Sequence, residues 1–160
     1  MRLLAIALAA SFVAAGCGSD GNGGGTINPN SGTWLFVPGS IVDDTCEYAD
    51  PPTDPSGDFA MLSTGDGTFT VNDGDVVFDC TVSGSAFNCP ERLTETIDAS
   101  PLDAIVSVHV SITGTFSSAN AASGRQTANV TCVGADCAAA GAAVGVTFPC
   151  SVSETFTATN

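Results

Sequence analysis

The chain has 160 residues, with 17 aspartates and glutamates, three arginines, one histidine and no lysine, so its formal net charge is −14. Without lysine, a phosphate-binding P-loop, a Schiff-base enzyme or a protein-kinase site cannot be built in the usual way, and the acidic charge excludes nucleic-acid binding through basic patches. The length fits one domain, and 44% hydrophobic residues suffice for a core.

The N-terminal segment has the pattern of a secretory signal. Met1 and Arg2 precede an apolar run that extends to Gly16 and is too short to span about 30 Å of hydrocarbon as a helix. We therefore expect a cleaved signal peptide over residues 1–16, which implies export. An ordinary secretory signal with an incidental Cys17 is one interpretation of the cleavage region.

The residues Ala14-Ala15-Gly16-Cys17 resemble the lipobox of bacterial lipoproteins. The resemblance implies that Cys17 is lipidated, becomes the mature N-terminus and anchors the chain to a membrane of the bacterial cell envelope. Gly18, rather than aspartate, follows the cysteine, which resembles the sorting pattern of outer-membrane lipoproteins. Residues 17–30 are rich in glycine and asparagine and predict a flexible linker before a single domain over residues 31–160.

Six cysteines follow the linker, an even number in a chain expected to reach an oxidising compartment. Three disulfides are therefore predicted among Cys46, Cys80, Cys89, Cys132, Cys137 and Cys150. Zinc is the competing interpretation, because the spacer between Cys132 and Cys137 fits half of a zinc site. Since the chain has no Cys-x-x-Cys pair to complete such a site and only one histidine, we expect no metal there.

From Ser31 onward, apolar and polar residues alternate, which predicts strands with one buried and one exposed face. The predicted strands cover residues 32–37, 58–64, 68–72, 76–83, 87–97, 104–116, 124–132 and 144–158. The alanine-rich stretch 135–143 is too short and too broken by glycine to stand alone as a helix, so no helix is expected after the signal.

Two short turns set the expected register of the middle strands. The pair Asp73-Gly74 suits a two-residue type I′ turn, which would place Val71 opposite Val76. The pair Gly84-Ser85 suggests a second reversal of the same length. Counting outward from this second turn places Val82 opposite Phe87.

The same count places Cys80 opposite Cys89 in a pair without hydrogen bonds. Cα atoms in such a pair are about 4.5 Å apart, which is within disulfide range, so a Cys80–Cys89 bond is predicted. The other four cysteines leave two pairings open. Cys132 with Cys137 would leave Cys46 for Cys150, whereas Cys132 with Cys150 would staple the last two strands.

Eight sequential antiparallel strands predict an all-β domain that closes into an up-and-down barrel, with a two-sheet β-sandwich as the alternative. Gly32-Thr33-Trp34, at the head of the first strand, resembles the Gly-x-Trp opening of lipocalins and related barrels. The resemblance implies a cup for a small apolar ligand with Trp34 plugging one end. The chain departs from that family in lacking an arginine or lysine over residues 156–160, and Trp34 can also fill a barrel end simply as a large apolar residue.

The search for catalytic residues centres on His109, the only imidazole. Its neighbours Ser107 and Ser111 lie two positions away on the same strand face, about 7 Å distant and parallel, which is too far for a Ser-His pair. We therefore expect no enzyme and no cofactor. Acidic residues gather between Asp43 and Asp58, but their spacing does not reproduce a calcium loop, so calcium remains an open alternative.

Two acids interrupt otherwise apolar rows and are the candidate ligand contacts together with Trp34. Glu91 and Glu154 share strand faces with buried residues, so each could act as a polar handle in a ligand cup. A β-bulge near Pro90 or beyond Val152 would instead turn them outward. The expected function is a non-enzymatic envelope lipoprotein that binds a small apolar ligand; the alternative is a structural or protein-interaction domain with a solid barrel interior.

Overall fold

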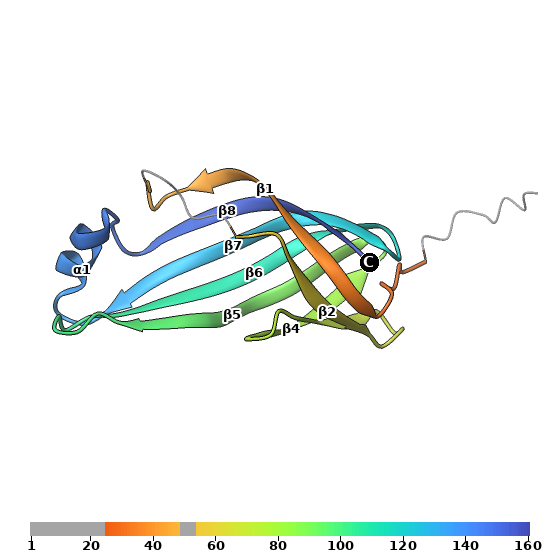
Figure 1. Cartoon of the computed structure of the whole chain (residues 1–160), viewed down its shortest axis with the longest axis horizontal. Coiled ribbons are helices and arrows are strands. Elements are labelled where there is room, and N and C mark those ends of the chain that lie inside the picture. The colour runs from red at the N-terminus through yellow and green to blue at the C-terminus, as the bar shows by residue number, and fades with distance from the viewer. Residues whose placement is uncertain (1–24, 49–53) are drawn as a thin grey trace, which may run out of the picture.

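The computed structural model describes residues 25–48 and 54–160, which form one closed antiparallel barrel (Figure 1). Its strands and single described helix, in chain order, are β1 (Gly32–Asp44), β2 (Gly57–Ser63), β3 (Thr68–Asn72), β4 (Val77–Ser83), β5 (Ala86–Asp98), β6 (Ile105–Ser118), β7 (Ala121–Val133), α1 (Cys137–Val144) and β8 (Cys150–Thr159). Each strand pairs with its neighbours in sequence and β8 pairs with β1, so the predicted up-and-down barrel is confirmed and the sandwich is excluded. The predicted signal peptide and Cys17 lie outside the described residues.

The strands differ in length, and this divides the barrel into two halves. β2, β3 and β4 have five to seven residues, whereas β5, β6 and β7 have 13 or 14. β4 pairs with β5 only over Thr81–Ser83, while β5 follows β6 as far as Asp98. One half is therefore a complete barrel, and the long strands continue beyond it as a curved sheet with an open edge along β5 (Figure 1).

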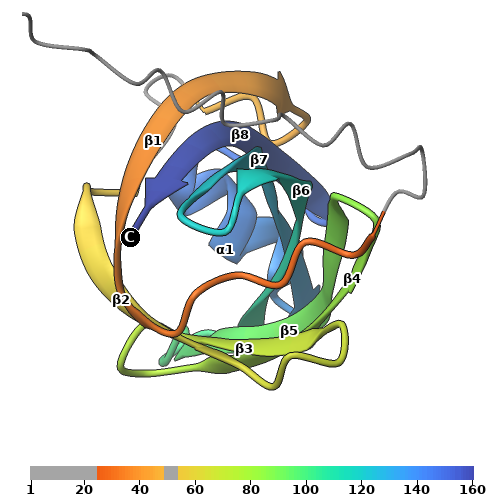
Figure 2. The ribbon, with the colours of Figure 1, turned by 90° about the vertical axis from the view of Figure 1, so that its right-hand side faces the viewer.

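The segment that precedes β1 crosses the end of the complete half (Figure 2). The backbone N–H of Ile27 donates to the Gly84 carbonyl in the β4–β5 turn at 2.8 Å. The N–H of Asn30 donates to the Ala119 carbonyl in the β6–β7 turn, also at 2.8 Å. Residues 26–31 thus join turns on opposite sides of the barrel and close this end, which we call the closed end.

Aromatic rings fill the interior of the closed half. Phe69, Phe87 and Phe116 are each at most 8% exposed, and their ring centroids are 4.8 to 5.8 Å apart. Trp34 is fully buried against Phe116 with a centroid distance of 6.1 Å. Such close tilted and edge-to-face contacts are typical of a well-packed aromatic core.

Two paired glycines make room for these rings. Gly114 on β6 lies opposite Gly124 on β7, and the outer neighbours of this pair are Phe87 on β5 and Phe156 on β8. A Cβ atom on Gly114 would lie 2.6 Å from the Phe87 ring, and one on Gly124 would lie 2.9 Å from the Phe156 ring. The large rings can therefore cover the sheet only because the residues beside them have no side chain.

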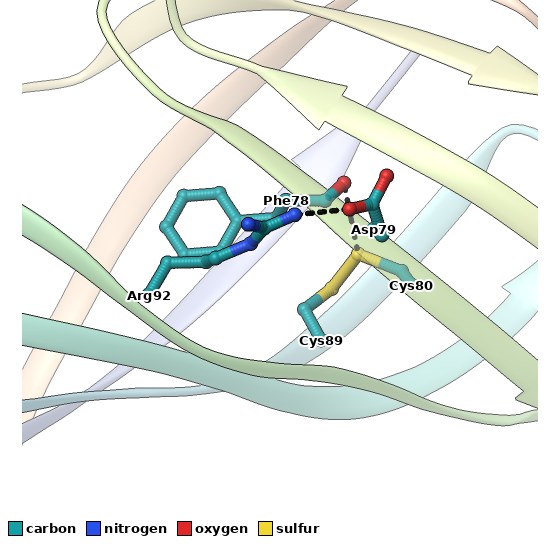
Figure 3. A network of polar contacts seen from close by, with 5 residues as sticks. All are labelled: Phe78, Asp79, Cys80, Cys89 and Arg92. Carbon is teal, nitrogen blue, oxygen red and sulfur yellow. Dashed lines mark hydrogen bonds and ion pairs between the residues drawn. A yellow bond between two sulfur atoms is a disulfide. The ribbon is translucent and has the colours of Figure 1, made fainter.

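Three disulfides staple the fold. The Cys80–Cys89 bond between β4 and β5 confirms the predicted pair, and its Cα atoms are 4.2 Å apart (Figure 3). Beside it, the Arg92 guanidinium of β5 forms an ion pair with Asp79 of β4. The other bonds are Cys46–Cys150 and Cys132–Cys137, which selects the first of the two pairings left open by the sequence.

The register expected at Asp73-Gly74 is wrong by two residues. Val71 lies opposite Phe78 rather than Val76, because the loop has four residues instead of two. The Asp73 carboxylate accepts the backbone N–H groups of Asp75 and Val76, at 3.0 and 2.8 Å. This side chain stabilises the wider turn, and the shift of two leaves the same residues facing the interior.

The expectation that no helix follows the signal is wrong, because α1 forms in the alanine-rich stretch 135–143 and ends at Val144; the last strand, expected to begin at residue 144, begins at Cys150. Tertiary contacts stabilise this short helix. The Cys132–Cys137 bond fixes its first residue, and the Asp136 carboxylate before it accepts the Asp103 N–H at 2.9 Å. Gly145 ends the helix with φ 78°, a conformation suited to glycine.

A second apolar cluster covers the concave side of the extended half. The Cys46–Cys150 disulfide packs there against Val130 of β7 and Val146 of the α1–β8 connection. Tyr48, which follows β1, is partly buried against the same cluster. The chain after β1 is thus tied onto the long sheet from which it would otherwise project.

Candidate functional site

The structure places Trp34 in a packing role at the closed end. Its side chain is 0% exposed, and its Nε1 donates to the Asn30 carbonyl at 2.9 Å. Phe59 and Phe116 contact the indole on two sides. Because Asn30 belongs to the closing segment, this hydrogen bond ties the cover to the core, and the indole has no surface left for a ligand.

Six phenylalanines on the inward faces of the predicted strands could either fill the barrel interior or line a cavity, and the structure packs them in the interior. Five of the six lie in the aromatic cluster of the closed half, and each is at most 8% exposed; these are Phe69, Phe78, Phe87, Phe116 and Phe156. The sixth, Phe148, packs on the second cluster near the Cys46–Cys150 bond. The five rings of the closed half therefore belong to one packed cluster, in which Phe69, Phe87 and Phe116 contact one another directly.

Glu91 lies outside the barrel interior. The register of β5 against β6 shifts between Cys89 and Arg92, so the chain has a bulge at the position where one was considered. Glu91 is exposed, and its carboxylate accepts a hydrogen bond from Asn129 of β7 at 2.6 Å. The bulge therefore removes Glu91 from the apolar row and from any interior site.

Glu154, in contrast, is buried in the interior. Its side chain is 6% exposed, between the inward-facing Val152 and Phe156 of β8, and its Oε2 has no hydrogen-bond partner. Gln126 of β7 and Ile41 of β1 are its partners across the two ladders. Burying a carboxylate without a hydrogen-bond partner costs free energy unless a cation, a proton or water compensates its charge. Glu154 is therefore the candidate functional residue of the molecule.

A second carboxylate, Asp54 in the β1–β2 connection, accompanies Glu154. The Gln126 Nε2 donates a hydrogen bond to Asp54 Oδ2. Burial raises the pKa of the Glu154 carboxyl, and repulsion by the Asp54 carboxylate raises it further, against a smaller lowering by the Asp54 backbone N–H. Loop Asp54, β7 Gln126 and β8 Glu154 are thus brought together; we call them the Glu154 cluster.

Sequence reasoning singled out Glu154 as an inward-facing acid and Asp54 only as one of the acids between Asp43 and Asp58 considered for calcium; it did not identify Gln126 or bring the three together. Gln126 interrupts an inward row of small and apolar residues on β7, from Ala122 to Val130, and this interruption is the signal that could have located it. No sequence signal places Asp54 beside Glu154, because the path of a loop cannot be inferred from alternation. Its position depends on the Cys46–Cys150 bond and on the ladder between β1 and β2.

His109 is half-buried on β6, opposite Leu93 and Asn129, and the described residues form no hydrogen bond with its imidazole. The geometry thus offers no Ser-His-acid arrangement in the part of the chain that the structure describes. Asp44, in the acidic stretch from Asp43 to Asp58, accepts the N–H groups of Glu47 and Tyr48 and so shapes its own loop. Over residues 25–48 and 54–160, no three His, Cys, Asp or Glu side chains gather as metal ligands.

One depression on the described residues is open to solvent. It measures about 690 Å³ and lies over the bend where Gly114 and Gly124 meet. Exposed side chains from β1, β6, β7 and β8 line it, among them Thr115, Ser123 and Arg125. Because these residues alternate with the inward-facing ones, the depression belongs to the outer face of the sheet and not to a cup inside the barrel.

Among the described residues, no helix is long and apolar enough to cross a membrane. The chain was also compared with known proteins. No family model, no curated protein and no solved structure matches it.

Proposed function

We propose that the protein is a non-enzymatic lipoprotein of the bacterial cell envelope, anchored through Cys17, whose barrel is a solid scaffold for a structural or protein-interaction role. The observation that carries this proposal is the packed closed half. Trp34 and five phenylalanines occupy the space that a ligand cup would need, and the segment over residues 26–31 covers its end. Of the two functions expected from the sequence, this packing favours the one with a solid interior.

The surface offers a second line of support. In the described strands β6, β7 and β8 the sole acidic residue is Glu154, and it faces inward, although the chain contains 17 acids. The outer face of these strands carries hydroxyl and amide groups together with Arg125. A partner with acidic groups could approach this face without the repulsion that the rest of the protein exerts.

Native mass spectrometry of the full chain, purified without reduction from its own membrane, tests the proposal. We expect the mass of an acyl-modified Cys17, the mass deficit of three disulfides and no bound small molecule. Cys17→Ser is the control and should lose membrane association without losing the fold. A stoichiometric apolar molecule that co-purifies would contradict the solid-scaffold role and favour ligand binding.

Site-specific photo-crosslinking in the native envelope tests the interaction role itself. A crosslinking side chain at Thr115, on the outer face of β6, should give a discrete adduct with an envelope component. The matched control is Thr81, an exposed threonine on β4 outside the β6–β8 face, which should give none. Equal yields at both positions would argue against a specific interaction surface.

A further inference from the structure

The Glu154 cluster contains negative charge that no described residue of the chain neutralises. Oε2 of Glu154 is buried and accepts no hydrogen bond, and Asp54 brings a second carboxylate beside it. Glu154 is buried and loses solvation, and the neighbouring Asp54 carboxylate, which is itself exposed, repels its charge. The native state therefore needs a positive charge or a proton at this point.

In the part of the chain that the structure describes, neither arginine faces the Glu154 cluster. The chain has no lysine, and Arg92 pairs with Asp79 on the outer side of β4. Arg125 precedes Gln126 directly, so its side chain points to the opposite face of β7, where it is exposed. Residues 25–48 and 54–160 thus supply no arginine or lysine to the Glu154 cluster, which leaves room for a cation from solution.

The groups that converge on this point are oxygen donors. Glu154 and Asp54 supply carboxylates, and the Gln126 amide, whose nitrogen is bonded to Asp54, supplies a carbonyl oxygen. Hard divalent cations with flexible coordination, above all Ca²⁺, take their ligands from such oxygens and complete the shell with water. We propose that Glu154, Asp54 and Gln126 bind one divalent cation of the calcium class inside the barrel.

The site would join the β1–β2 connection to the paired strands β7 and β8. Asp54 lies on a loop, whereas Glu154 and Gln126 face each other on paired strands. A cation shared by them ties the loop to the wall between the aromatic cluster and the second cluster. It also relieves the repulsion between the two carboxylates, so cation binding stabilises the native state.

Calorimetric titration of the full, disulfide-bonded protein with CaCl₂ at pH 7.5 and constant ionic strength, after treatment with a chelator, tests this proposal. We expect one bound Ca²⁺ per chain, with clearly weaker binding of Mg²⁺, and a rise in Tm with CaCl₂. Glu154→Gln and Asp54→Asn should each weaken Ca²⁺ binding by about tenfold or more, because each removes a charged ligand.

Two controls keep the outcome interpretable. Glu91→Gln and Asp58→Asn change exposed carboxylates of the same kinds and should leave the Ca²⁺ affinity unchanged. Ca²⁺ binding that survives in both cluster variants would overturn the proposal, because the ion would then sit elsewhere. The proposal is also overturned if no Ca²⁺ binds and the Glu154→Gln variant at pH 7.5 is as stable as the wild type at acidic pH. The cluster would then be neutralised by a proton on Glu154.

Discussion

Two carboxyl groups show how the environment of a single residue sets its charge. The pKa of Asp66, in the β2–β3 turn, lies below its ordinary value because the hydroxyls of Thr64 and Thr68 donate to the carboxylate. The pKa of Glu154 lies above its ordinary value because the side chain is buried and faces Asp54. Asp66 is therefore suited to remaining ionised, whereas an ionised Glu154 without a compensating positive charge destabilises the native state.

Substitution of Glu154 by glutamine should therefore stabilise the protein in a chelating buffer. Because the pKa of Glu154 is raised in the native state, the stability contributed by its protonated carboxyl group is fully present below the ordinary pKa of 4.5. That stability is lost as the pH rises through the native pKa. At pH 7, Glu154→Gln should raise the free energy of unfolding by about 1–3 kcal/mol, and the gain should disappear below pH 4. Urea unfolding across this pH range measures it, and Glu91→Gln, an exposed control, should change stability little.

A second residue-scale prediction concerns the glycine that faces Phe87. Gly114→Ala places a methyl group against that ring and the Ser123 carbonyl, so it should cost about 1–3 kcal/mol of stability through overpacking. Gly57→Ala on β2 is the matched control, since its Cβ would contact nothing within 4 Å. Thermal unfolding of the two variants decides; equal Tm values would mean that the rings can move aside.

At the scale of elements, β5 has the most exposed backbone. Its residues from Pro90 to Asp98 pair only with β6, so one side of the strand is an unpaired edge. Two register shifts and the exposed charges of Glu91, Arg92 and Glu95 interrupt this edge. Bulges, proline and charges are the usual means by which edge strands avoid pairing with other chains.

Removal of those charges should cause self-association. The triple variant Glu91→Thr, Arg92→Thr and Glu95→Thr presents an uncharged edge of high β propensity, and we expect concentration-dependent dimers or larger species. Sedimentation velocity at several protein concentrations measures this. Asp75→Thr, in the β3–β4 turn, changes the net charge by the same amount and should behave as the wild type; an identical profile for the triple variant would show that the bulges alone protect the edge.

Alternation and turn chemistry predicted the existence and order of all eight strands, and they predicted the Cys80–Cys89 pair. They failed where distant contacts decide the local structure. β1 continues past Pro38 and Gly39 because two bulges and the Ser40–Thr155 hydrogen bonds keep it on β8. Helix α1 depends on a disulfide and on Asp103, and the position of Asp54 depends on the path of a loop; none of these contacts is written in local periodicity.

At the scale of the whole molecule, the three disulfides cross-link very different lengths of chain. The Cys46–Cys150 bond has a sequence separation of 104 residues, and the Cys80–Cys89 bond has a separation of nine. The first joins the chain after β1 to the last strand and so closes the barrel covalently. The second reinforces a hairpin that the turn already holds.

Loss of the long cross-link should therefore cost more than loss of the short one. Chain-entropy estimates give about 4.7 kcal/mol for removing Cys46–Cys150 and about 2.6 kcal/mol for removing Cys80–Cys89. The double variants Cys46→Ala/Cys150→Ala and Cys80→Ala/Cys89→Ala are matched, because all four side chains are buried. Guanidinium unfolding compares them, and a larger loss for the hairpin pair would show that strand pairing alone keeps the barrel closed.

If Cys17 carries the proposed lipid, the closing segment over residues 26–31 sets which way the molecule faces. Thr26 lies nine positions after Cys17, and an extended chain of that length reaches about 30 Å at most. A lipid on Cys17 would therefore keep the closed end of the barrel next to the bilayer. The extended sheet, α1 and the Cys132–Cys137 loop would then point away from the membrane, which makes them the parts of the protein that reach farthest into the surrounding space.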